Sequence, residues 1–352
     1  MVEPANLLEG LRARKPAALA RAISLVENGS AGSEALLAGL HSLVGTARRV
    51  GVTGPPGGGK STLVERLAAH YRAAGLTVGV IAIDPSSPFT GGALLGDRIR
   101  MERAALDPGV FIRSMASRGS LGGMATTTGE VADVMDAYGF DRILIETVGV
   151  GQSELDIASV SDTTVVVLVP ESGDGIQVMK AGLMEIADVY VVNKSDRPGA
   201  DLLRQELEVA IGLKSGLAFR HVPGHHRPEI QTAKTAREQA ALATVADGGA
   251  AWEPPVLATA ASRGEGVAEL SGALDRHFAF LERDGGLAAR RARQLERRTR
   301  DVFERALRRW AWSDAGPRAA LEAALAEVAA GRRSPYDAAA AVVQRIRRSE
   351  GA

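Results

Sequence analysis

Apolar positions recur at helical spacing near the start of the chain and form short continuous runs further on. Over residues 6–44 the spacing predicts a helical hairpin with a break at Asn28-Gly29. Beyond Arg49, β-branched runs alternate with helical stretches. These runs are 50–53, 78–83, 142–145, 163–169, 189–192 and 256–259. Continuous apolar strands that alternate with helices are typical of a mostly parallel sheet covered on both faces, so the pattern predicts a doubly wound α/β fold.

The last third of the chain changes character. Residues 214–252 show no periodicity and are expected to form an insertion or a long loop. Between Arg290 and Arg309, nine arginines and three acidic residues alternate with apolar residues at helical intervals. A nucleic-acid patch is one interpretation of this charge, but the apolar repeat favours an amphipathic helix that docks on another subunit.

Composition narrows the class of protein. The 352 residues include 42 basic and 42 acidic ones and no cysteine, so disulfides, thiolate metal sites and thiol nucleophiles are excluded. The balanced charge gives no global field for nucleic acid or a membrane surface. No apolar run approaches the length of about 20 residues that spans a bilayer, and the N-terminus lacks the order of a signal peptide. We therefore expect a cytoplasmic protein that binds neither nucleic acid nor membrane.

One glycine-rich segment fits the pattern G-x-x-x-x-G-K-[ST], with a predicted strand before it and a predicted helix over 62–74 after it. Its glycines allow successive N–H groups to surround phosphate oxygens at the N-terminus of a helix. Lys60 is expected to reach the β- and γ-phosphates and Ser61 to bind Mg²⁺. A chance glycine-rich turn is the alternative. The expected nucleotide contacts are Gly54, Pro55, Pro56, Gly57, Gly58, Gly59, Lys60, Ser61 and Thr62.

A second segment indicates which base is bound. Asn193-Lys194-Ser195-Asp196 follows a predicted strand, and the Asp196 carboxylate can accept both N1–H and N2–H of guanine, whereas adenine offers no matching donors. Lys194 would lie along the base and Asn193 would tie this loop to the phosphate loop. A simple turn is the alternative. A later strand ends in Thr259-Ala260-Ala261, where the N–H of Ala261 could meet guanine O6 although Ala260 replaces a serine found in many GTPases.

Acidic residues follow two predicted strands and could complete a catalytic site. Glu146 is expected to hold Mg²⁺, Gly149 to offer its N–H to the γ-phosphate, and Gln152 to orient the attacking water or to be a surface glutamine. Asp84 and Asp97 flank a Gly- and Pro-rich loop at the edge where open α/β sheets bind ligands. Either could serve Mg²⁺ or water, or could instead cap a turn or a helix.

The order of these segments closely resembles the methylmalonyl-CoA mutase-associated GTPases, the MeaB/ArgK family. The similarity rests on 54–62, on 84–88 through 95–98, on 146–154 and on 193–196, and it runs from about residue 5 to residue 280. It implies a Mg²⁺-dependent, GTP- and GDP-binding P-loop chaperone that gates adenosylcobalamin delivery to methylmalonyl-CoA mutase, or to a related mutase, and protects that enzyme.

The resemblance also implies roles for parts of the chain that pattern alone does not explain. Asp84, Asp97 and Glu146 would serve Mg²⁺ and hydrolysis. A segment over 171–180 would relay the presence of the client enzyme, and its working residues would be Asp174, Gln177 and Lys180, although Lys180 could simply be a solvated helix residue. The C-terminal helices would form a dimerisation arm, which predicts a homodimer.

Three domains follow from these assignments: an N-terminal helical cap (1–46), a GTP-binding P-loop domain (47–282) and a C-terminal helical arm (283–352). Two other functions remain open. A GTPase that inserts metal into nickel enzymes would need metal ligands, for which only His221, His225 and His226 share a loop. A small-molecule kinase would need an acceptor pocket and a preference for ATP, against which Asp196 argues.

Overall fold

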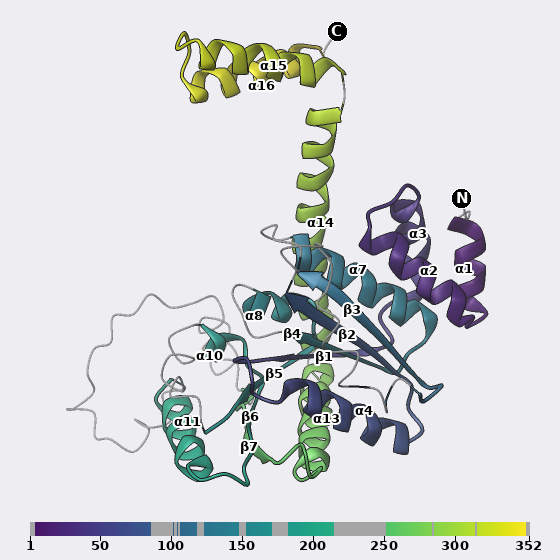
Figure 1. Ribbon diagram of the computed structural model, residues 1–352, viewed down its shortest axis with the longest axis vertical. Coiled ribbons are helices and arrows are strands. Elements are labelled where there is room, and N and C mark those ends of the chain that lie inside the picture. The colour runs from purple at the N-terminus through teal and green to yellow at the C-terminus, as the bar shows by residue number, and fades with distance from the viewer. Residues whose placement is uncertain are drawn as a thin grey trace, which may run out of the picture. The chain divides into compact units, whose positions relative to one another are not determined.

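A computed structural model describes residues 4–85, 101, 104, 106–117, 123–147, 153–170, 182–214, 251–283, 285–313 and 315–349. The chain divides into two compact units, Met1–Ala292 and Arg293–Ala352. In the described part of the first unit, seven strands form one sheet with the order β3-β2-β4-β1-β5-β6-β7 (Figure 1). They are β1 (Arg48–Thr53), β2 (Val78–Pro85), β3 (Val110–Ser117), β4 (Arg142–Thr147), β5 (Thr163–Leu168), β6 (Val189–Asn193) and β7 (Val256–Thr259). Every pairing is parallel, which confirms the predicted fold class.

Strand β3 was not predicted from the apolar pattern. It pairs with β2 from Val110 to Ser117 and lies at one end of the sheet order. Its central residues include Arg113, whose guanidinium pairs with Glu27. A strand at a sheet edge does not have to be apolar on both faces, so its sequence lacks the continuous run that identifies the inner strands.

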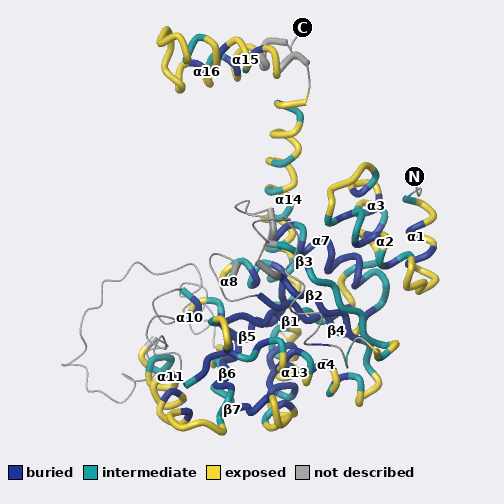
Figure 2. The backbone as a smooth tube through the Cα atoms, in the orientation of Figure 1, coloured by how far each residue is buried: buried dark blue, intermediate teal, exposed yellow. Residues whose placement is uncertain are grey.

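Side chains of the inner strands alternate between two apolar layers. Val165 and Val167 of β5 pack in a cluster with α4 (Lys60–Ala73) and α13 (Val267–Arg283). Val166 and Leu168 belong to a cluster with α10 (Leu183–Ile186) and α11 (Ala200–Lys214). Figure 2 shows these strands as the buried centre of the unit. Because both faces are covered, the strands read as continuous apolar runs.

The N-terminal helices form a further layer over α7 (Gly123–Tyr138). The expected hairpin corresponds to α2 (Pro16–Glu27) and α3 (Ser33–Leu40), and the break between them includes Gly29 at a φ of +56°. An additional helix, α1 (Pro4–Arg12), precedes them, and a short 3-10 helix (His41–Leu43) follows. Apolar side chains of all three α-helices share one buried cluster with α7, so these helices are part of the first unit.

The arginine-rich segment forms α14 (Gly286–Ser313), which begins in the first unit and continues into the second. Phe303 and Leu307 are among its exposed large apolar side chains. The second unit also holds α15 (Ala315–Ala329) and α16 (Pro335–Ser349), which pack together through small apolar residues. Among the described residues, no helix has the length and apolarity that a membrane span requires.

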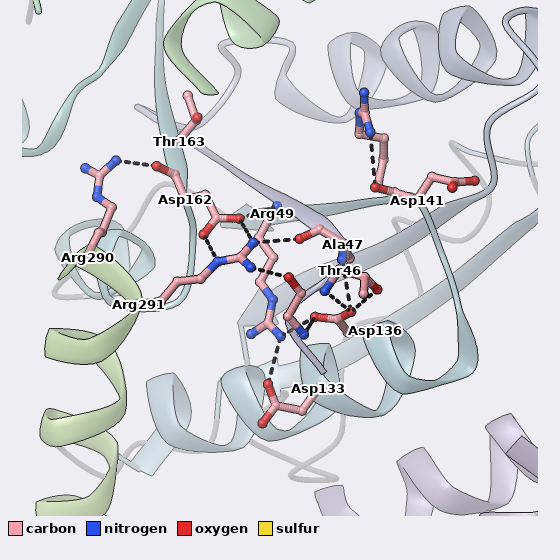
Figure 3. A network of polar contacts seen from close by, with 12 residues as sticks. Thr46, Ala47, Arg49, Asp133, Asp136, Asp141, Asp162, Thr163, Arg290 and Arg291 are labelled. Carbon is pink, nitrogen blue, oxygen red and sulfur yellow. Dashed lines mark hydrogen bonds and ion pairs between the residues drawn. The ribbon is translucent and has the colours of Figure 1, made fainter. Parts of the chain in front are cut away.

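A network of buried charges lies at the amino-terminal edge of the sheet (Figure 3). The Asp136 carboxylate of α7 accepts hydrogen bonds from the N–H groups of Gly45, Thr46 and Ala47, from the Thr46 hydroxyl and from the Arg49 guanidinium. Burial acts to raise the pKa of Asp136, but the charge of Arg49 and these donors outweigh it, so the pKa is lowered. The network therefore fixes the entry into β1.

The same edge anchors the first turns of α14. Arg291 donates from Nε and Nη2 to the two oxygens of Asp162, both at 2.8 Å, and Arg290 pairs with Asp188 at 3.0 Å. Asp162 and Asp188 immediately precede β5 and β6. The start of α14 is thus bound by charge-assisted hydrogen bonds to the ends of two central strands.

Candidate nucleotide-binding site

The glycine-rich loop, residues 54–59, lies between the end of β1 and the start of α4, at the centre of the sheet. Gly54 has a φ of +134°, and a Cβ there would lie 2.1 Å from the carbonyl oxygen of Val167. Gly59 has a φ of +79°, and a Cβ there would lie 2.5 Å from Nδ2 of Asn193. The backbone of β5 therefore excludes a side chain at Gly54, and a side chain at Gly59 would displace the Asn193 amide that bonds to Gly58. The loop opens onto the N-terminus of α4, where helix N–H groups and the helix dipole favour an anion.

Lys60, the first residue of α4, folds back over this loop. Its Nζ donates to the carbonyl oxygens of Gly54 at 2.8 Å and Pro55 at 2.9 Å, and the residue is only 5% exposed. Glu154 of α8 (Ser153–Asp156) is close enough for the charge of Lys60 to act on it; burial nevertheless raises the pKa of its carboxyl group. The loop itself therefore holds a positive charge beside the helix N-terminus.

Ser61, in the first turn of α4, contacts Glu146 of β4. The Ser61 hydroxyl donates to Oε1 of Glu146 at 2.6 Å, and Glu146 is buried near the end of β4, where it pairs in register with Val52. The next residue, Thr147, donates from its hydroxyl to that of Thr53 at 2.9 Å and so joins the ends of β4 and β1. A hydroxyl and a carboxylate in contact form an oxygen donor set of the kind that Mg²⁺ prefers.

The side chain of Asn193, the last residue of β6, connects the phosphate loop to the end of β7. Its Nδ2 donates to the carbonyl oxygen of Gly58 at 2.8 Å. Its Oδ1 accepts from the hydroxyl of Thr259 at 3.0 Å and from the N–H of Ala261 at 3.1 Å. The tie to the phosphate loop is the one that the sequence predicts. The bond from Ala261 was not expected: the N–H that we assigned to guanine O6 donates to Asn193, because the residues after β7 turn back across the end of β6.

The segment in which the sequence predicts base recognition continues from Asn193 in a tight turn. Lys194 has a φ of +56°, and the N–H of Ser195 donates to the carbonyl oxygen of Thr259 at 2.9 Å. Asp196 is paired with Arg263, whose Nη2 lies 3.0 Å from Oδ2. Sequence patterns do not identify this partner, since the two residues are 67 positions apart and share no recognised motif.

Several expected site residues lie outside the described part of the chain. They are Asp97, Gly149, Gln152, Asp174, Gln177 and Lys180, together with His221, His225 and His226. Asp84 is described in its backbone alone, at the end of β2, opposite Ala116. The described residues bring together the phosphate loop, Glu146 and the Asn193 segment, all at the carboxyl edge of the parallel sheet.

The described site has the arrangement of a P-loop nucleoside triphosphatase. A central strand leads through a glycine-rich loop into a helix, and a serine and a carboxylate lie beside the loop. An asparagine joins the loop to a motif of the guanine-binding type. Comparison with known proteins gives the family. The model of the methylmalonyl-CoA mutase-associated GTPase MeaB family matches residues 19–315. The chain belongs to this family and is a GTPase.

Individual relatives cover most of the chain. A protein of Pyrococcus abyssi is 43% identical over 343 residues, which is 93% of this chain and 97% of that protein. The mitochondrial methylmalonic aciduria type A homolog of Mus musculus is 36% identical over 246 residues, 70% of this chain and 52% of that protein. A crystal structure of a LAO/AO transport system kinase has a TM-score of 0.64 and 26% identity, and covers 98% of this chain and 97% of that one.

Proposed function

We propose that GTP binds with its phosphates in the glycine-rich loop and its guanine at Asp196, and that this site hydrolyses it. The observation that carries the proposal is the Asn193 side chain, which bonds to Gly58 of the phosphate loop and to the end of β7 at once. It fixes the distance between the two regions that a purine nucleotide would have to bridge.

Charge neutralisation is the main catalytic contribution of this chain. The Lys60 ammonium exchanges the carbonyl oxygens of Gly54 and Pro55 for β- and γ-phosphate oxygens, and the N–H groups of the loop and of the first turn of α4 take the others. Once Lys60 has changed partners and all these donors contact the phosphates, little further reorganisation is needed as charge develops on the leaving GDP.

Ser61 and Glu146 would hold Mg²⁺, with Asp84 and Asp97 as the further acids that the sequence suggests. The contact between the Ser61 hydroxyl and the Glu146 carboxylate supports this, since both are hard oxygen ligands beside the loop. When bound, Mg²⁺ would offset charge on the β- and γ-phosphates. We assign Gln152 to orientation of the attacking water and Gly149 to the γ-phosphate.

Two substitutions test the nucleotide assignment. Asp196→Asn should weaken GDP binding at least about tenfold and favour xanthosine diphosphate, because the amide offers a donor where guanine needs an acceptor. Lys60→Ala should abolish GTP hydrolysis. The control Lys15→Ala, which replaces an exposed lysine, should leave the rate of hydrolysis unchanged. Unchanged GDP affinity in Asp196→Asn would remove the guanine assignment. Tighter binding of ATP than of GTP by the natural protein would favour the kinase alternative.

We further propose that the client of this GTPase is an adenosylcobalamin-dependent acyl-CoA mutase. The family description, which associates its members with methylmalonyl-CoA mutase, supports this, as does the similarity to the mouse methylmalonic aciduria type A homolog. Asp174, Gln177 and Lys180 are the proposed relay between client and nucleotide. GTP turnover should rise when the protein is mixed with methylmalonyl-CoA mutase loaded with adenosylcobalamin. No change with the mutase of the same cell would contradict the client assignment.

The exposed apolar residues of α14 support a homodimer formed through this helix. Phe303 is 61% exposed and Leu307 45%. Sedimentation of the natural protein should give twice the monomer mass, and Phe303→Glu should shift it to the monomer. A monomer at micromolar concentration would rule out the dimer proposal without affecting the nucleotide site.

A further inference from the structure

The loop that follows β7, residues 260–266, carries Arg263 to the carboxylate of Asp196. The Nη2–Oδ2 distance is 3.0 Å, and the side chains of Arg263 and Asp196 are 58% and 22% exposed. The loop is closely held: the N–H of Arg263 donates to the carbonyl oxygen of Ala260 at 2.8 Å, and Ala260 forms an isolated bridge with Glu265. Arg66 of α4 donates to the carbonyl oxygen of Ser262 at 2.9 Å. The backbone that supports Arg263 is therefore fixed from several sides.

We propose that Arg263 is the positioning residue for guanine recognition: it orients the Asp196 carboxylate. This inference rests on the proposed function, in which Asp196 reads the base. Guanine offers two parallel N–H donors, so both carboxylate oxygens must face it in one plane. Each carboxylate oxygen has two acceptor positions, so Oδ2 can bind Arg263 and a base N–H at the same time.

Two features explain why this position needs an arginine. Ala260 and Ala261, the first two residues of the loop, have no side-chain donor that could hold the carboxylate. A base bound edge-on to Asp196 also removes water from a charged group, and that cost falls when the carboxylate keeps a cationic partner. Arg263 supplies this partner from the solvent side of the pair.

GDP affinity distinguishes the positioning role of Arg263 from the opposite role, inhibition of guanine binding. Arg263 could compete with guanine for Asp196, in which case its removal would strengthen GDP binding. The positioning role requires the reverse. The positioning role also requires that Arg263 act only through Asp196. Replacing Arg263 should therefore have no effect on GDP binding once position 196 carries no charge.

The test is a double-mutant cycle with GDP and ADP as ligands. Arg263→Ala should weaken GDP binding about threefold to tenfold at low salt, less in 0.5 M salt, and leave the weak binding of ADP unchanged. ADP reports the phosphate loop alone, so it also shows that the variant is folded. Arg263→Lys should retain part of the effect. The exposed Arg204, which pairs with Glu208 on α11, gives the matched control Arg204→Ala, with no loss expected.

In the Asp196→Asn background, Arg263→Ala should cause no further loss of GDP affinity. Unchanged or tighter GDP binding by Arg263→Ala alone overturns the positioning role. An equal loss in both backgrounds also overturns it, because Arg263 would then act independently of Asp196. If Asp196→Asn itself binds GDP as tightly as the natural protein, the guanine assignment fails and the inference fails with it.

Discussion

Asp136 offers a quantitative test of the charge network at the amino-terminal edge of the sheet. Its side chain is fully buried. Oδ1 accepts from the N–H groups of Thr46 and Ala47 at 3.1 and 3.0 Å and from the Thr46 hydroxyl at 3.0 Å, whereas Oδ2 accepts from the N–H of Gly45 at 2.8 Å and from Arg49 at 2.9 Å. Asp136→Asn keeps the shape of this group and removes its charge.

The size of the stability loss depends on which carboxylate oxygen of Asp136 the amide nitrogen replaces. The amide oxygen can take the three bonds of Oδ1, but the amide nitrogen then faces two donors, the N–H of Gly45 and the guanidinium of Arg49. Hydrogen bonds to charged groups contribute about 1.5–3 kcal/mol each. Arg49 retains Asp133 at 2.8 Å, which limits the damage. We expect a loss of about 3–5 kcal/mol, a large part of the roughly 5–15 kcal/mol by which proteins are stable.

Urea unfolding measures this loss if the signal comes from the first unit alone. Trp252 bonds to the carbonyl oxygen of Asp188 in that unit, whereas Trp310 and Trp312 lie in the second. Trp310→Phe with Trp312→Phe therefore makes fluorescence specific for the first unit. With a slope near 3 kcal/mol per molar urea, the Asp136→Asn midpoint should fall by about 1 M or more. Asp275, which is 49% exposed, gives the control Asp275→Asn, expected to cost under about 1 kcal/mol.

The pH dependence has a definite sign. The pKa of Asp136 is lower in the folded protein than its ordinary value of 3.8, so the ionised carboxylate stabilises the fold at every pH above that value. This stabilisation is lost as the pH falls through the lowered pKa. The gap between the natural protein and Asp136→Asn should be constant from about pH 8 to pH 5.5 and narrow below about pH 4. A gap below 1 kcal/mol at neutral pH, or one that widens in acid, would refute the reasoning.

Two further predictions concern the nucleotide site. Asn193→Ala removes three buried hydrogen bonds and should weaken GDP binding at least about tenfold. Thr259→Val removes one of the three and should weaken GDP binding about threefold. Equal effects of the two variants in titrations with labelled GDP would contradict the connecting role of Asn193. Gly59→Ala and Gly75→Ala impose the same strain, with φ of +79° and +80°, but nothing lies within 4 Å of a Cβ at Gly75. Gly59→Ala should therefore lose GDP binding, while Gly75→Ala should only lower the melting temperature slightly.

The parts of the fold that were predictable are those whose physical cause is local. The inner strands must be apolar on both faces, and a phosphate loop must combine glycines with a helix N-terminus, so short sequence windows predict both. Strand β3 was missed because an edge strand accepts Arg113 among its apolar residues. In the sequence, Asp136 cannot be told from a solvent-exposed helix residue. Three of its hydrogen-bond donors are backbone N–H groups, and every residue except proline has one, so no residue type in the sequence marks them as its partners.

In the nucleotide-binding site, too, the local features were predictable and the long-range contacts were not. The sequence predicts that Asn193 reaches the phosphate loop, because the motif that contains it follows a strand adjacent to that loop. It does not predict that Ala261 gives its N–H to the same side chain, nor that Arg263 pairs with Asp196. Both depend on where the turn after β7 places Ala261 and Arg263 relative to residues that lie 67 or 68 positions earlier in the chain.

The shape of the phosphate loop is imposed by its neighbours as much as by its own residues. Gly54 must be glycine because Val167 of β5 presents its carbonyl oxygen there, and Gly59 because Asn193 at the end of β6 lies against it. Each strand is immediately preceded by an acid, Asp162 or Asp188, that binds the first turns of α14. The strands that shape the phosphate loop at one edge are therefore held at the other by the helix that leads into the C-terminal unit, so the position of the loop depends on contacts across the whole sheet.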